Sequence, residues 1–106
     1  MSDGLKKEHR RAIKTILDAH PRVEKAVLFG SRAMGTFTVE SDVDIVLYGD
    51  NLTLTDQIDL AGEIDEINMP QRVDLLRHRM IEEEKLLEHI RRYGKPFGEE
   101  EETSRK

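Results

Sequence analysis

The stretch from Val27 to Tyr48 constrains the fold of this chain more than any other part of the sequence. An apolar segment runs into Gly30 and Ser31, and a turn-rich connection then leads to Asp42 and Asp44 at the start of a second apolar segment. Apolar residues alone could build a core, whereas a glycine break and two alternating aspartates at the mouth of a strand cost stability unless something binds there. The stretch therefore predicts a ligand site built on two strands.

Apolar periodicity, capping residues and prolines predict alternating helices and strands around this stretch. In the helix before Pro70, for example, Ile58, Ala61, Ile64 and Ile67 recur at helical spacing. In chain order, the expected elements are a helix from Asp3 to Ala19, a strand from Val23 to Phe29, a helical turn from Ser31 to Met34, a strand from Asp42 to Tyr48, a helix from its N-cap Thr55 to Asn68, a strand from Gln71 to Leu76 and a helix from Ile81 to Tyr93 with Gly94 as its C-cap.

The order of these elements predicts one sheet packed against helices, an α/β (α+β) fold class. If Ser31 at the end of the first strand and Asp42 at the start of the second serve one site, both lie at the same edge of the sheet, so these strands run antiparallel. A helical crossover joins the second strand to the third, which favours a parallel pair. We therefore expect a small mixed β-sheet in a single domain.

Length and composition limit the classes of protein to which the chain can belong. Its 106 residues suffice for one core, and we expect a domain over residues 1–98 followed by a disordered charged tail over residues 99–106. The absence of cysteine excludes disulfides and thiolate metal sites, which fits a reducing cytoplasm. No apolar run approaches the roughly 20 residues of a membrane span, and the N-terminus lacks the apolar region of a signal peptide. The expected protein is soluble and cytoplasmic.

Charge and aromatic content argue against direct binding of nucleic acid. Lys and Arg total 17 against 22 Asp and Glu, and the net charge of -5 has the wrong sign for a broad electrostatic grip on nucleic acid. Aromatic residues make up 5% of the chain and are scattered, which is too few for a base-stacking platform. A nucleotide can still bind, because metal ions and backbone amides hold phosphates without a basic surface.

Three aspartates are the candidate metal ligands. Asp42 and Asp44 project from one face of a predicted strand, with side-chain roots about 7 Å apart, a gap that carboxylate oxygens can close around a divalent ion. Unpaired, they would repel each other, and Mg²⁺ removes that penalty. Asp74 is a candidate third ligand if the third strand lies beside the second. The alternative for Asp74 is a solvent-facing acid on an edge strand. Three acids in one cluster could hold two metal ions, one on a triphosphate and one on an attacking hydroxyl.

Gly30 and Ser31 supply the complementary half of the predicted site. A glycine lets a phosphate approach the backbone closely, and the amides of the following turn, with the Ser31 hydroxyl, can donate hydrogen bonds to its oxygens. Arg32 either adds positive charge for the nucleotide or pairs with a nearby acid. Taken alone, a Gly-Ser pair most often marks an ordinary turn, and one Asp-x-Asp is only moderately informative.

The four histidines show no spacing that is typical of a zinc site. We interpret them as residues of helix surfaces or loops. They are His9, His20, His78 and His89.

The combination of the two polar motifs is far more specific than either alone. A Gly-Ser pair, ten residues and then Asp-x-Asp resembles the signature of the nucleotidyltransferase superfamily that includes DNA polymerase beta. More closely, the run GSRAMGTFTVESDVDI resembles the minimal nucleotidyltransferases, or MNT proteins. The later strand RVDLL places Asp74 where this family has its third acid, so that the resemblance covers the chain from Val23 to Leu76.

This resemblance implies the nucleotidyltransferase fold and the transfer of a nucleoside monophosphate, usually from ATP, to a hydroxyl with loss of pyrophosphate. It implies that Asp42 and Asp44 bind both Mg²⁺ ions, and that Asp74 binds the second ion and helps to activate the hydroxyl. It also implies that Gly30 and Ser31 hold the triphosphate.

The resemblance further implies a partner. Family members of this size are typically encoded beside a HEPN protein, a helical RNase toxin, and act as its antitoxin, in some cases by adding AMP to a tyrosine of that partner. Small size and apolar helix faces favour a homodimer or a hetero-complex. The alternative is a non-catalytic binding module that neutralises a partner by occlusion and keeps its acids as an inherited or nucleotide-sensing site.

Overall fold

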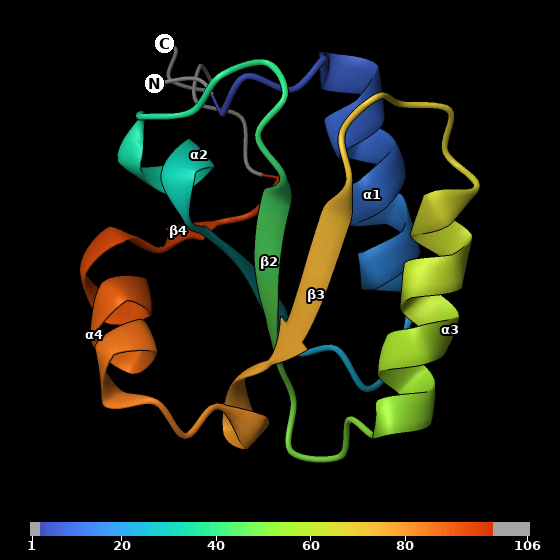
Figure 1. The fold of residues 1–106 in the computed structure, drawn as a ribbon. Helices are drawn as coiled ribbons and strands as arrows, with labels where there is room; N and C mark the ends of the chain where they lie inside the picture. Colours follow the sequence, from blue (N-terminus) through green and yellow to red (C-terminus); the bar gives the residue numbers. More distant parts are fainter. Residues whose placement is uncertain (1–2, 99–106) are drawn as a thin grey trace, which may run out of the picture.

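The structure is a computed structural model that describes residues 3–98, so the tail predicted at residues 99–106 lies outside the described residues. One four-stranded sheet with the strand order β3-β2-β1-β4 forms its centre, and helices flank it (Figure 1). The elements are α1 (Lys7–Ala19), β1 (Lys25–Phe29), α2 (Ser31–Met34), β2 (Val43–Tyr48), α3 (Leu54–Asp65), β3 (Val73–Arg77), the 3-10 helix η1 (His78–Met80), α4 (Glu84–Tyr93) and β4 (Lys95–Pro96).

The directions of the strands confirm the predicted mixed sheet. Strand β1 pairs antiparallel with β2, whereas β2 pairs parallel with β3 across the α3 crossover. The end of β1 and the start of β2 therefore meet at one end of the sheet, where Phe29 is the register partner of Asp44. The sequence did not predict the two-residue strand β4, which pairs antiparallel with the outer edge of β1.

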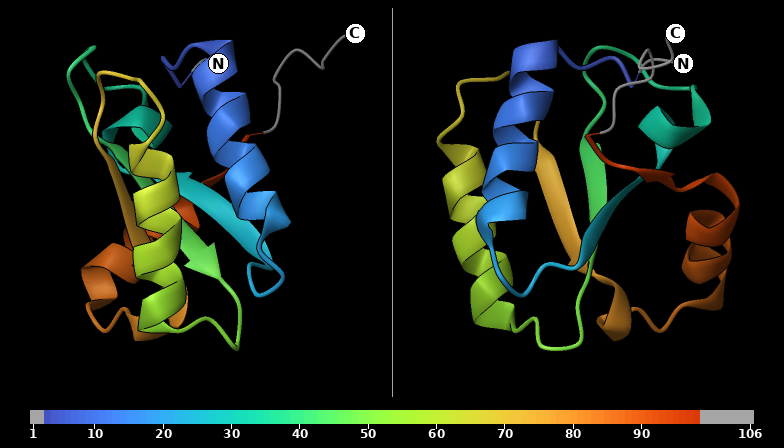
Figure 2. Two further views of the ribbon diagram at one scale, coloured as in Figure 1. Left: turned by 90° about the vertical axis from the view of Figure 1, so that its right-hand side faces the viewer. Right: turned by 180° about the vertical axis from the view of Figure 1, so that it is seen from behind.

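The two faces of the sheet are covered to different extents. Helices α1 and α3 pack on one face of the sheet, which is turned toward the viewer in the right-hand view of Figure 2. They form the larger core with the inward residues of β2. On the other face, Ile90 of α4 packs against Phe29 and Val46 in a smaller cluster. Val46, Asp44 and Asp42 alternate with the residues of the larger core, so the smaller cluster and the two aspartates share one face.

Helix α3 differs most from its prediction. It begins at Leu54, because Thr53 caps it: the Thr53 hydroxyl accepts the Asp56 amide hydrogen, and the Asp56 carboxylate accepts the Thr53 amide hydrogen. The row that faces the core contains Leu60 and Ile64. The predicted stripe was wrong at Ala61, which is exposed, and at Ile58, which is 60% exposed because it lies on the opposite side of the helix from Leu60.

Helices α1 and α4 begin later in the chain than predicted, in each case because of the local backbone. Helix α1 starts at Lys7 rather than near Asp3, whose carboxylate accepts hydrogen bonds from the Leu5 amide and the Arg10 guanidinium. Helix α4 starts at Glu84 rather than Ile81, because the backbone is still extended at Ile81 and at the N-cap Glu83. None of the helices within residues 3–98 is both long enough and apolar enough to span a membrane.

Candidate active site

Three aspartates lie close together at the end of the sheet where β1 meets β2. Asp44 and Asp74 are register partners on the parallel strands β2 and β3, so their side chains leave the same face from backbones about 4.8 Å apart. Asp42 comes two residues before Asp44, directly ahead of β2. The structure thus brings together the three acids that the sequence singled out, including Asp74, which is about 30 residues away along the chain.

Gly30 joins the two halves of the motif physically. It has a φ of 78°, a left-handed value that favours glycine, and a Cβ at this position would overlap the Oδ2 atom of Asp44. The carboxylate of Asp44 therefore lies directly against the Gly30 backbone. Only a residue without a side chain allows this contact between the glycine break and the aspartate pair.

The surroundings of Asp44 favour its protonated form. Burial raises the pKa of Asp44 above its ordinary value, and the negative charges of Asp74 and Asp42 raise it further. Only a protonated His89 would act in the opposite direction, as the smallest of these influences. Asp44 is therefore a carboxylate whose charge the fold does not neutralise, which is the condition that a bound cation would relieve.

Arg32 lies where the sequence did not place it. Its side chain is only 2% exposed, and its guanidinium donates to the main-chain carbonyl oxygens of Asp3 at 2.8 Å and of Ser41 at 3.0 Å. Longer bonds reach the carbonyls of Thr38 and Val39. Because these bonds commit its donors to the loop before β2, the expected contact with a nucleotide is replaced by a structural one, in which Arg32 holds the loop that delivers Asp42.

Ser31 begins the single turn of α2, as the sequence predicted. Its main-chain carbonyl accepts the amide hydrogens of Gly35 and Thr36, which closes the turn. No side chain or main-chain group among residues 3–98 is hydrogen-bonded to its hydroxyl. The hydroxyl stays available for a phosphate oxygen next to Gly30.

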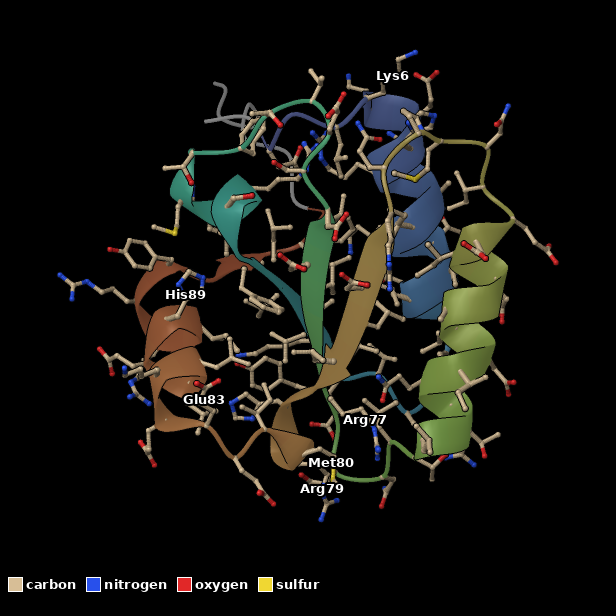
Figure 3. All side chains as sticks on the ribbon, in the orientation of Figure 1. Lys6, Arg77, Arg79, Met80, Glu83 and His89 are labelled. Carbon is tan, nitrogen blue, oxygen red and sulfur yellow. The ribbon has the colours of Figure 1, made fainter. Side chains whose placement is uncertain are left out.

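His89 also belongs to this site, although its place in the sequence did not indicate it. It projects from α4 toward the end of β1 (Figure 3), and its Nε2 atom accepts the amide hydrogen of Gly30 at 2.9 Å. The one signal in the sequence is its place beside Ile90, next to the apolar face of an amphipathic helix. That signal does not reveal a partner on another element.

A comparison with known protein families shows to which family a chain with this site belongs. The family described as "Polymerase beta, Nucleotidyltransferase" matches residues 11–103, which is most of the chain. The chain belongs to the polymerase beta nucleotidyltransferase family. The resemblance carried by the Gly-Ser and Asp-x-Asp motifs is therefore confirmed at the level of the family, and this nucleotidyltransferase can be compared with its relatives.

One relative of this nucleotidyltransferase is the "putative protein adenylyltransferase MJ0604" of Methanocaldococcus jannaschii. It is 44% identical over 45 residues, which cover 38% of this chain and 45% of the relative. The match thus spans less than half of the relative's length.

Solved structures of toxin–antitoxin complexes also resemble this nucleotidyltransferase. A chain from a crystal structure of a toxin–antitoxin with AMP-PNP is 26% identical, with a TM-score of 0.67, over 87% of this chain and 72% of that one. A second match, at 22% identity and a TM-score of 0.63 over 87% of this chain and 71% of that one, comes from a complex of tri-AMPylated Shewanella oneidensis HEPN toxin with MNT antitoxin. The second match shows a shared fold.

The acids of this nucleotidyltransferase fit a hard divalent cation in their chemistry. Mg²⁺ is commonly held by one or two carboxylates together with water and substrate phosphates, and the mutual repulsion at Asp44 favours such an ion. Within residues 3–98, no three histidine, aspartate or glutamate side chains, the three aspartates included, are placed so that they could hold one metal ion together. Asp74 also accepts a hydrogen bond from the Arg72 guanidinium at 3.1 Å. A magnesium ion here would therefore be held first by Asp42 and Asp44. Asp74 could join them only if its hydrogen bond with Arg72 were broken or shared.

Proposed function

We propose that this chain transfers AMP from ATP to a hydroxyl of a partner protein, in a reaction that requires Mg²⁺, and that it is the antitoxin of a HEPN/MNT toxin–antitoxin pair. The observation that carries the proposal is the contact between Gly30 and the Asp44 carboxylate. It joins a backbone suited to a triphosphate to a carboxylate suited to a metal ion. The relative described as a protein adenylyltransferase supports the reaction, and the match to a toxin–antitoxin with AMP-PNP supports the nucleotide and the partner.

Each polar residue has a role in this proposal. Asp42 and Asp44 would hold two Mg²⁺ ions, with Asp74 as a further ligand of the second. When bound, these ions neutralise charge on the triphosphate and on the attacking and leaving oxygens. The Ser31 hydroxyl donates to a phosphate oxygen beside Gly30. Nothing in this division of roles requires Arg32 to touch the nucleotide.

The proposed step forms one bond and breaks one. The acceptor oxygen bonds to the α-phosphorus of ATP, the bond from that phosphorus to the bridging oxygen breaks, and pyrophosphate leaves. Asp74, which is half-buried at the edge strand β3, accepts the hydrogen bond of the acceptor hydroxyl and then its proton. Since β3 is an edge strand, a partner can approach Asp74 from the side of the sheet.

The test is transfer of label from α-labelled ATP to the product of the neighbouring gene, with and without Mg²⁺. The variant Asp42→Asn/Asp44→Asn removes two charges at the site, and Asp59→Asn/Asp65→Asn removes the same number from the exposed face of α3 as a matched control. We expect transfer with the wild type and the control. With the site variant we expect a loss of at least about 100-fold, because the metal ligands are removed.

Two results would count against the proposal. Label transfer that survives the site variant would show that these acids are not the metal ligands. Neutralisation of the toxin by the wild type and the site variant alike, without transfer of label, would instead favour a binding module that acts by occlusion.

A further inference from the structure

Helix α4 reaches the glycine of the motif through one side chain. His89 lies 59 residues after Gly30 in the sequence, and its Nε2 atom accepts the Gly30 amide hydrogen at 2.9 Å. The bond is partly buried and joins a side chain to the main chain at the end of β1. It is therefore a link between the helix on the smaller-cluster face of the sheet and the start of the phosphate-binding turn.

The direction of this bond fixes the form of the imidazole. An amide nitrogen can only donate, so Nε2 must accept, and the ring proton of this form lies on Nδ1. In this arrangement His89 supplies an acceptor to the site and no donor. It also keeps the Gly30 amide away from a phosphate oxygen and leaves that contact to the Ser31 hydroxyl and the amides that follow.

Gly30 is held on three sides. Its amide hydrogen goes to His89, its carbonyl oxygen accepts the amide hydrogens of Ala33 and Met34 at 3.1 Å each, and its Cα lies against the Asp44 carboxylate. The first of these bonds comes from outside the motif, whereas the others come from α2 and β2. Loss of the His89 acceptor would release one side of the peptide that sets the position of Ser31.

Packing holds the His89 ring in the orientation that this bond needs. The ring lies edge-on to Phe29, with centroids 6.2 Å apart, and tilted against Tyr93 at 5.2 Å. The next residue, Ile90, is 5% exposed and anchors α4 in the smaller cluster. A ring that only filled space would not need its Nε2 atom aimed at a backbone amide.

We infer that His89 is a positioning residue for the nucleotide: its Nε2 atom holds the Gly30 peptide so that the Ser31 hydroxyl and the Asp44 carboxylate face the triphosphate together. The inference deepens the proposed function and rests on it for the identity of the ligand. His89 acts through Gly30 and does not touch the reacting atoms.

Three variants separate the acceptor from the ring. His89→Gln keeps a side-chain oxygen that can accept the Gly30 amide hydrogen, His89→Leu keeps apolar bulk without an acceptor, and Tyr93→Leu disturbs the packing of the ring while leaving the acceptor in place. For each, the measurements are the hydrogen-exchange rate of the Gly30 amide, the Kd of AMP-PNP in the presence of Mg²⁺, and the melting temperature.

We expect His89→Leu to accelerate exchange at Gly30 and to raise the Kd of AMP-PNP about tenfold, the effect of one lost hydrogen bond. We expect His89→Gln to restore most of both, and Tyr93→Leu to bind AMP-PNP within about twofold of the wild type although its melting temperature falls. A His89→Leu protein that binds AMP-PNP like the wild type would overturn the inference. So would a His89→Gln protein as weak as His89→Leu, because the ring rather than the acceptor would then matter.

These measurements distinguish the inference from the proposed function. If the wild type binds AMP-PNP and the variants follow the expected order, but no label reaches a partner, the inference stands and the transfer reaction falls. If the wild type transfers label and His89→Leu does so with unchanged affinity, the inference alone falls.

Discussion

Asp44 and Asp56 are both buried or partly buried aspartates, but their surroundings have opposite effects on the charge of the carboxylate. Asp56, at the start of α3, accepts the Thr53 amide hydrogen at 3.0 Å and the Arg22 guanidinium at 2.9 Å, with His20 at 3.4 Å. The hydrogen bond with the Thr53 backbone lowers the pKa of Asp56, and the nearby charge of Arg22 contributes to the same shift. The polar partners of this carboxylate favour its ionised form and outweigh its burial, which acts in the opposite direction.

Asp44 has the opposite surroundings. Burial and two like charges raise its pKa, and among residues 3–98 no basic side chain forms an ion pair with it. The charge of Asp56 stabilises the fold, whereas the charge of Asp44 costs stability, a cost that a bound cation would offset. The difference shows that partners, and not burial alone, separate a structural acid from a candidate functional one.

The largest effect on stability is expected where the structural acid is removed. Asp56→Ala removes half of the capping box and leaves Arg22 without its carboxylate, so we expect the melting temperature to fall by about 4–8 °C, the shift that loss of a helix cap gives in a domain of this size. The measurement is thermal unfolding, with Asp59→Ala one turn away as the exposed control. An equal loss in both variants would remove the contrast between the two acids.

The pH dependence of this effect has a definite sign. The folded-state pKa of Asp56 is lowered, so its stabilisation is present above the unfolded value of about 3.9 and is lost as the pH falls through the folded value. The difference in melting temperature between the wild type and Asp56→Ala should therefore shrink in acid.

A smaller effect of opposite sign is expected at the candidate functional acid. Asp44→Asn removes a charge that burial and like-charged neighbours disfavour, so we expect a gain of a few degrees in melting temperature at neutral pH without divalent ions. The folded-state pKa is raised, so the cost of the charge is present above that pKa and disappears below the unfolded value. The gain should vanish toward low pH.

Magnesium gives a direct check on the same variant. Added Mg²⁺ should raise the melting temperature of the wild type and leave Asp44→Asn unchanged, because only the wild type keeps its pair of carboxylates. A gain in stability from Mg²⁺ that is equal in both proteins would place the ion elsewhere.

The smallest effect is expected at Arg72. Its pair with Asp74 is exposed, with 77% of the Arg72 side chain accessible, and such pairs contribute only about 0–1 kcal/mol. Arg72→Ala should thus change the free energy of unfolding by less than about 1 kcal/mol in denaturant unfolding. Because it frees Asp74, it should also strengthen Mg²⁺ binding; weaker Mg²⁺ binding would show that Arg72 supports the site.

The sequence predicted those features that depend on local pattern. The i, i+2 spacing of Asp42 and Asp44 predicted that both project from one face of a strand. The Gly30-Ser31 pair predicted the end of a strand and the start of a helical turn. The strand directions followed from assuming that Ser31 and Asp42 serve one site. The family, the mixed sheet and the position of Asp74 beside Asp44 could all be predicted in this way.

Features that depend on distant backbone groups could not be predicted. Arg32 donates to the carbonyl of Asp3, 29 residues away, and His89 accepts from the amide of Gly30, 59 residues away. Every residue type other than proline carries the same amide and carbonyl, so such partners leave no mark in the sequence. Strand β4 was missed for a related reason, since two residues show no periodicity.

The parallel pairing of β2 with β3 fixes the distance between Asp44 and Asp74 and also links their alignment to the stability of the fold. Main-chain hydrogen bonds set the Asp44–Asp74 register, so side-chain adjustments elsewhere cannot change the spacing of the two strands. A slip of one residue would turn Asp74 toward the larger core and Val73 toward water. Such a chain would bury an unpaired carboxylate and would be less stable than the observed one, so the stability of the core selects the register that aligns the two acids.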